Sequence, residues 1–165
     1  MLYNGLVRAR NMAQNAWARI DVQLKRRYDL IPNLIETVKG YAAHERQALE
    51  SVTRARSMAA GAQTMDQRIQ AENMLSGALR SLFAVAEGYP QLHASHNFMQ
   101  LQQELSDTES KIAFARQFYN DMAMKFNSRI QVFPANLLAG AMGLHFIPYF
   151  EVADSRERNA VQVRF

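Results

Sequence analysis

A long heptad pattern between residues 97 and 133 constrains the fold of this chain more than any other feature. Its apolar positions are separated mostly by alternating gaps of three and four, and Thr108 is the polar slot among them. These positions are Phe98, Leu101, Leu105, Ile112, Ala115, Tyr119, Met122, Phe126, Ile130 and Phe133. Such a seam predicts a helix that meets other helices along its whole length. Phe114 and Phe118 add a second stripe, which favours a bundle of at least three helices over a two-stranded coil.

Three further helices are expected before this one. Apolar periodicity predicts four helices in all, over residues 2–28, 30–60, 65–87 and 95–133. The predicted fold is therefore all-α, an antiparallel up-and-down four-helix bundle with long helices over residues 1–133. A short irregular C-terminal segment, residues 134–165, is expected to pack on or near one end of the bundle. Within it, a helical turn is expected at 136–142, ended by Gly143, with an extended apolar stretch after it.

The junction near Pro32 has two interpretations. Asp29 is a good N-cap, and Pro32 would then fall in the first helical turn, where its missing N–H costs little. This favours a tight reversal between two helices. The alternative is one continuous helix kinked at Pro32. A clearer signal follows at residues 64–67, Thr-Met-Asp-Gln, which match a capping box at the start of the third helix.

Four asparagines suggest a register between the first and last helices. Asn4 and Asn11 are seven residues apart, as are Asn120 and Asn127, so each pair lies on one helix face. If the two helices are antiparallel, Asn4 would approach Asn127 and Asn11 would approach Asn120. Paired amides would then fix the register, as a buried Asn does in coiled coils.

Composition bounds the class of protein. The chain has 165 residues, no cysteine and a formal net charge of +4, so disulfides, thiolate metal sites and a cysteine nucleophile are excluded. A charge this mild favours no nucleic-acid partner. The sequence has no run of 18 apolar residues and begins directly with helical periodicity instead of a signal peptide.

No catalytic, cofactor-binding or metal-ligating residues are predicted. His93 and His96 are three residues apart, but they lie beside a proline turn with no carboxylate near them. The Glu-x-x-His pattern of di-iron bundles is missing, and so are nucleophile elbows and phosphate loops. The basic run at residues 25–27 is interpreted as complementing the dipole at the end of the first helix.

Several motifs together resemble one bacterial family. They are YNGLV at residues 3–7, IDVQLKRRYDLIPNL at 20–34, ETVKGY at 36–41, AVAE at 84–87 and FYN at 118–120. On these the chain is identified as similar to the LemA family. The resemblance covers nearly the whole chain and implies a helical bundle behind a single N-terminal transmembrane helix, with no established catalytic activity.

The resemblance also sets expectations about location and role. Family members place the membrane helix just before the Tyr-Asn-x-Leu-Val stretch, and here only two residues precede it. The chain is therefore expected to be either a trimmed soluble domain or an anchorless member. A cell-membrane location is expected from the family, and the basic balance after such an anchor favours a cytoplasmic bundle. The expected function is a non-enzymatic, membrane-associated scaffold that binds a protein partner or the bilayer surface. The alternative is a small-ligand- or metal-binding helical bundle with an unrecognised catalytic activity.

One end of the predicted bundle is the candidate contact surface. The start of the first helix, the end of the last helix and the segment after Pro134 should meet there. Residues 137–150 carry no Asp, Glu, Lys or Arg and are too few to span a membrane. The expected contact residues are Leu144, Phe146, Ile147, Tyr149 and Phe150, with the aromatic members suited to a headgroup boundary. The alternative is that this segment folds back over the open end of the core.

Overall fold

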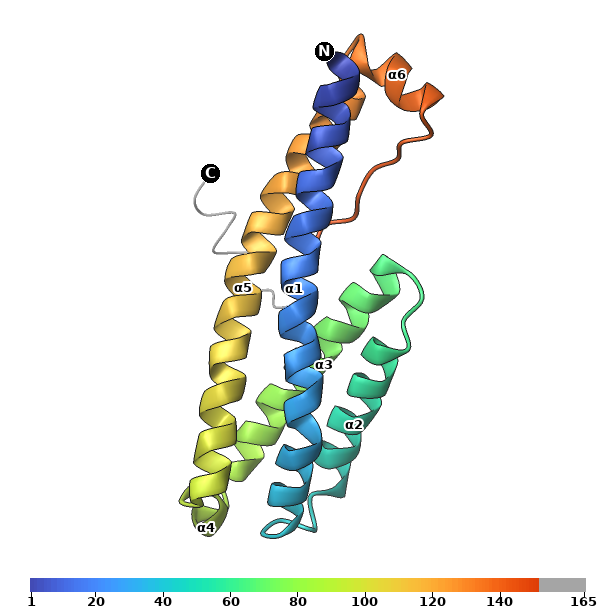
Figure 1. The fold of residues 1–165 in the computed structure, drawn as a ribbon. Coiled ribbons are helices and arrows are strands. Elements are labelled where there is room, and N and C mark those ends of the chain that lie inside the picture. Colours follow the sequence, from blue (N-terminus) through green and yellow to red (C-terminus); the bar gives the residue numbers. More distant parts are fainter. Residues whose placement is uncertain (152–165) are drawn as a thin grey trace, which may run out of the picture. The chain divides into compact units, whose positions relative to one another are not determined.

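The computed structural model describes residues 1–151 and contains only helices and their connections within that range (Figure 1). The helices are α1 (Leu2–Lys39), α2 (Arg46–Ala60), α3 (Met65–Ala86), α4 (Pro90–His93), α5 (His96–Gln131) and α6 (Ala135–Ala141). The all-α class is confirmed, while the four-helix arrangement stays a prediction. Residues 152–165, the rest of the predicted C-terminal segment, lie outside the described residues.

The chain divides into two compact units, which are described separately. The first unit contains Met1–Arg27 and Glu104–Phe150, and the second contains Tyr28–Gln103. The first unit therefore consists of the first part of α1, most of α5, α6 and the extended segment that follows α6. The second unit holds the end of α1, then α2, α3, α4 and the start of α5.

In the first unit, α1 and α5 run antiparallel. Arg129 bonds Gly5 across the pair, Trp17 packs against Tyr119, and Arg27 is paired with Glu109. Across these three contacts the residue number increases along α1 while that of its partner on α5 decreases, as expected for antiparallel helices. The predicted seam is buried at most of its positions, Thr108 included, while Ala115 is half-buried. The second stripe is wrong, because Phe114 is 78% exposed and Phe118 is also exposed.

The predicted reversal at Pro32 is wrong, because α1 continues through it to Lys39. A proline inside a helix leaves the carbonyl four residues earlier without its usual N–H donor. That carbonyl belongs to Tyr28, and Arg56 of α2 donates its Nε–H to it at 2.9 Å. The buried stripe also runs on without a break through Ile31, Leu34 and Val38. The residues predicted to begin the second helix therefore belong to the first.

The basic run at residues 25–27 consequently lies inside a helix and not at its end, so the dipole interpretation is wrong. Arg27 is only 1% exposed and its guanidinium bonds the carboxylate of Glu109 on α5. A buried guanidinium is retained only where it is paired and hydrogen-bonded, because desolvation of the charge is costly.

In the second unit, α2 and α3 form a helical hairpin (Figure 1). The capping box is confirmed: the N–H of Gln67 donates to Thr64 Oγ1 at 3.1 Å, and the N–H of Thr64 donates to Gln67 Oε1 at 3.4 Å. The start of α5 is joined to the end of α1, since Asn97 Nδ2 donates to Thr37 Oγ1 at 3.0 Å.

Candidate functional site

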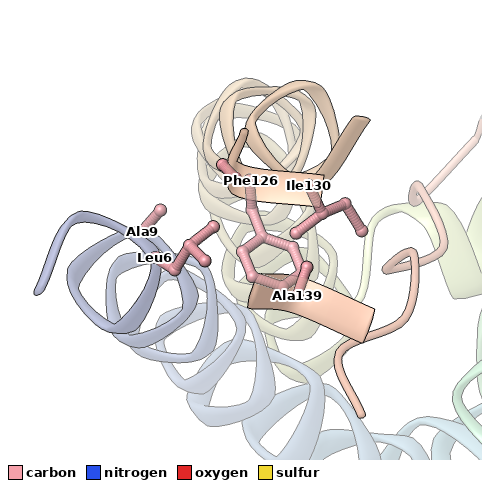
Figure 2. Close-up of a cluster of buried hydrophobic side chains, with 6 residues drawn as sticks. Leu6, Ala9, Phe126, Ile130 and Ala139 are labelled. Carbon is pink, nitrogen blue, oxygen red and sulfur yellow. The ribbon is translucent and has the colours of Figure 1, made fainter. Parts of the chain in front are cut away.

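The candidate contact surface lies in the first unit, where α1 begins and α5 ends. Figure 2 shows side chains of these two helices and α6 converging on one buried cluster. Its members are Leu6, Ala9, Phe126, Ile130, Ala135 and Ala139. The predicted meeting of the start of the first helix, the end of the last helix and the following segment is therefore confirmed.

The turn after α6 redirects the chain along α5. The N–H of Leu144 donates to Ala139 O and the N–H of Gly143 donates to Gly140 O, which is the Schellman arrangement. Gly143 has φ +69°, a left-handed conformation that side chains with a Cβ rarely adopt. The predicted helical turn and its glycine stop are thus confirmed.

Residues 144–150, called the strap below, then run back along α5 and are held by asparagines. Asn127 donates to Ile147 O at 2.9 Å and accepts from Ile147 N at 2.8 Å. Asn120 does the same with Phe150, donating at 3.0 Å and accepting at 2.8 Å. Between them, the hydroxyl of Tyr119 donates to Pro148 O at 2.8 Å.

The spacing of the two asparagines matches the spacing of the residues that they bind. Seven residues of helix advance about 10.5 Å, while three residues of extended chain advance about 10 Å.

The predicted Asn–Asn pairing across α1 and α5 is wrong, because Asn4 and Asn11 are exposed. Each stands two residues before a buried position, Leu6 or Ala13, and two residues are about 200° around a helix.

The strap places the five predicted contact residues in different environments. Phe150 is 3% exposed, with its ring 6.0 Å from that of Trp17, so its expected role at the surface is wrong. Leu144 and Ile147 are half-buried against the cluster of Figure 2. Phe146 is 60% exposed and Tyr149 is also exposed. Among the five residues, Phe146 is therefore the most exposed, and Tyr149 follows at 39%.

Further apolar residues at this end of the unit are exposed, although the sequence pattern did not predict their exposure. They are Leu2, Tyr3, Val132, Phe133 and Leu137. The prediction placed Phe133 in the buried seam, but it is 73% exposed because α5 ends at Gln131. The exposed positions lie in the first turn of α1, directly after α5 and on α6.

Within residues 1–151, no three His, Asp or Glu side chains gather as a metal site would require. A hollow of about 590 Å³ in the second unit is lined by cations of Lys39, Arg46 and Arg54 together with the acidic Glu50. The hydroxyl of Tyr89 donates to the carboxylate of Glu45, and this hydrogen bond raises the pKa of Tyr89, so that phenol is a weaker acid than an isolated tyrosine.

No helix among the described residues has the length and apolar character that crossing a bilayer requires.

Comparison with known proteins gives one family. Residues 16–165 match the sequence model of the LemA family. The protein LemA of Metamycoplasma hominis is 30% identical over 92% of this chain and 69% of its own length. The magnetosome protein MamQ of Magnetospirillum gryphiswaldense is 26% identical over 91% of this chain. Magnetosome protein MamQ 2 of Paramagnetospirillum magneticum is also 26% identical, over 92% of this chain. The chain spans about two thirds of these relatives, 65% in both MamQ proteins.

Proposed function

This chain belongs to the LemA family, and from that premise we propose that it is a non-enzymatic, membrane-associated helical domain whose first unit contacts a bilayer surface. The contact surface is the end of that unit where α1 begins and α5 ends. We call it the apolar end and define it by Leu2, Tyr3, Val132, Phe133 and Leu137. Phe146 of the strap, which follows α6, is a further exposed apolar residue of this unit.

The observation that carries this proposal is the exposure of these side chains on a packed support. Large apolar side chains gathered at one place on a surface mark sites of membrane or protein contact. Here they surround a buried cluster that fixes α6 against α1 and α5. Residues 130–150 also contain no Asp, Glu, Lys or Arg, so no charged side chain of that segment must be dehydrated on insertion.

The aromatic members favour a bilayer over a protein partner. Amphipathic rings are enriched at membrane–water interfaces, where one edge is apolar and the other is hydrated. Tyr3 supplies one such ring, and the exposed Phe133 and Phe146 add apolar rings of the kind found on the buried face of interfacial helices. A partner protein remains the competing occupant, and the test separates the two.

Vesicle flotation tests the proposal. The full chain should float with vesicles made of equal parts phosphatidylcholine and phosphatidylglycerol, while Phe133→Ser/Leu137→Ser should stay at the bottom. The matched control is Val22→Ser/Phe114→Ser, which removes a similar amount of exposed apolar surface elsewhere in the first unit. Circular dichroism confirms that all three forms are helical. The proposal is wrong if wild type does not float, or if both double variants lose flotation equally.

A further inference from the structure

Charge is distributed very unevenly along this chain. Residues 1–20 and 122–150 contain five Lys or Arg residues and no Asp or Glu. The whole chain has 19 basic and 15 acidic residues, so the remainder holds 14 and 15. The entire net positive charge of the protein therefore comes from the part of the first unit nearest the apolar end.

Three of these cations surround a hollow between α1 and α5. It has a volume of about 210 Å³ and is lined by Arg8, Ala9, Met12, Met122, Lys125 and Arg129. Its lining combines three cations with apolar surface and includes no carboxylate. Such a site would take an anion that carries an apolar group.

Arg129 is held in place across the helix pair. Its Nη1 donates to Gly5 O at 2.9 Å. A Cβ on Gly5 would lie 3.2 Å from that same nitrogen, so glycine permits the close approach. A guanidinium has five N–H donors, and its planar fork matches the oxygens of a phosphate. The bond to Gly5 uses one donor.

The three cations of the hollow lie within about two helical turns of the apolar end. At 1.5 Å per residue, Arg129 is about 3 Å and Lys125 about 9 Å along the helix axis from Gln131, the last residue of α5, and Arg8 is about 9 Å from Leu2 in α1. If the apolar end enters the interface, the hollow reaches the layer of lipid phosphates. Anionic lipids attract basic groups there.

We propose that this hollow binds the headgroup phosphate of an anionic phospholipid, with the first carbons of the lipid against Met12 and Met122. This inference rests on the proposed function, because the apolar end brings the hollow to the phosphate layer. The apolar lining should make the hollow bind a lipid more tightly than free phosphate, because free phosphate has no apolar group to place against Met12 and Met122.

A solution experiment tests the headgroup site without a bilayer. The full chain, labelled with ¹³C at its methionine methyl groups, is titrated with monomeric dihexanoyl-phosphatidylglycerol. The Met12 and Met122 signals should shift and saturate, while Met58 and Met74 of the second unit should not. Dihexanoyl-phosphatidylcholine and inorganic phosphate should each produce much weaker shifts. Equal affinity for phosphatidylcholine, or for inorganic phosphate, would overturn the assignment.

Matched variants show whether the hollow or general charge is responsible. Arg8→Gln/Lys125→Gln removes two cations of the hollow, and Arg19→Gln/Lys111→Gln removes two cations elsewhere in the first unit. Each cation near an anionic surface contributes about fivefold to binding, so the first variant should bind phosphatidylglycerol vesicles about 25-fold more weakly. The control should lose much less. Equal losses in both variants would contradict a specific site.

The two proposals fail in different ways. If wild type floats but Arg8→Gln/Lys125→Gln floats equally well and the methyl signals do not move, the headgroup site is wrong and the bilayer contact stands. If no form floats while dihexanoyl-phosphatidylglycerol still shifts Met12 and Met122, the bilayer contact is wrong and the anionic-lipid site stands.

Discussion

Asn127 binds Ile147 through both halves of its side-chain amide, with Oδ1 accepting at 2.8 Å and Nδ2 donating at 2.9 Å. The amide thereby supplies the strap with the hydrogen-bond donor and acceptor that a neighbouring strand would supply in a sheet. Asn120 repeats the arrangement at Phe150. The strap obtains backbone hydrogen bonds from a helix, whose own backbone groups are already used.

Removal of one amide should release part of the strap. Asn127→Ala deletes two hydrogen bonds and leaves polar groups of Ile147 without partners, so the free energy of unfolding should fall by about 2–3 kcal/mol. Urea denaturation measures the change, and hydrogen exchange at the Ile147 amide should accelerate. Asn11→Ala, at an exposed site, is the control and should stay within about 0.5 kcal/mol. Unchanged hydrogen exchange at the Ile147 amide would contradict the conclusion that Asn127 holds the strap.

The packing of Phe150 can be followed through the single tryptophan. Trp17 lies 6.0 Å from the Phe150 ring and 5.4 Å from the Tyr119 ring, centroid to centroid. Phe150→Ala should cost about 3–5 kcal/mol and shift the emission of Trp17 to longer wavelength, because water reaches the indole. Phe146→Ala changes an exposed ring and should leave both quantities nearly as they are. A Trp17 spectrum unaffected by Phe150→Ala would argue against this packing.

The buried seam of α5 predicts two contrasting alanine substitutions. Phe126 is 1% exposed within the cluster of Figure 2, whereas Phe114 on the same helix projects outward. Phe126→Ala should lower the free energy of unfolding by about 3–5 kcal/mol, because it leaves a cavity. Phe114→Ala should change it by less than about 0.5 kcal/mol. Thermal denaturation of the two variants measures this difference. Equal midpoints would refute the assignment of Phe126 to the buried face of α5 and of Phe114 to its exposed face.

A double-mutant cycle tests how α1 passes through Pro32. Arg56→Met removes the donor to Tyr28 O and should cost about 1.5–3 kcal/mol, as expected for a hydrogen bond from a charged group. With Pro32→Ala the backbone N–H at position 32 is restored and can serve that carbonyl. The cost of Arg56→Met should then be smaller in the Pro32→Ala background. Additive losses would show that the Arg56 bond does not compensate for the proline.

Periodicity predicted the helices and their buried faces because it reports local geometry. The seam of α5, the capping box at Thr64 and the turn at Gly143 each depend on residues within a few positions of one another. The continuation of α1 was also visible in the even spacing of Leu24, Ile31 and Val38. The local pattern around Pro32 outweighed that signal, since nothing nearby in sequence shows that Arg56 serves the Tyr28 carbonyl.

The candidate surface was predicted in location but not in its details. The charge-free stretch and the meeting of three segments at one end both followed from the sequence. Phe150 and Phe133 exchanged their expected environments, because the end of α5 at Gln131 frees Phe133 and the strap buries Phe150. No pattern in the sequence predicted that the apolar residues Leu2 and Leu137 would be exposed.

The sequence by itself determined that this chain is helical and which face of each long helix is apolar. These properties follow from spacing along one element, which every helix of that sequence expresses locally. Only the tertiary structure decided which partner each polar group finds: Arg56 for the Tyr28 carbonyl, Glu109 for Arg27, and the strap for Asn120 and Asn127. Such partners lie 20 to 82 residues apart in the chain, and a buried polar group is satisfied by whichever donor or acceptor the packing brings within about 3 Å.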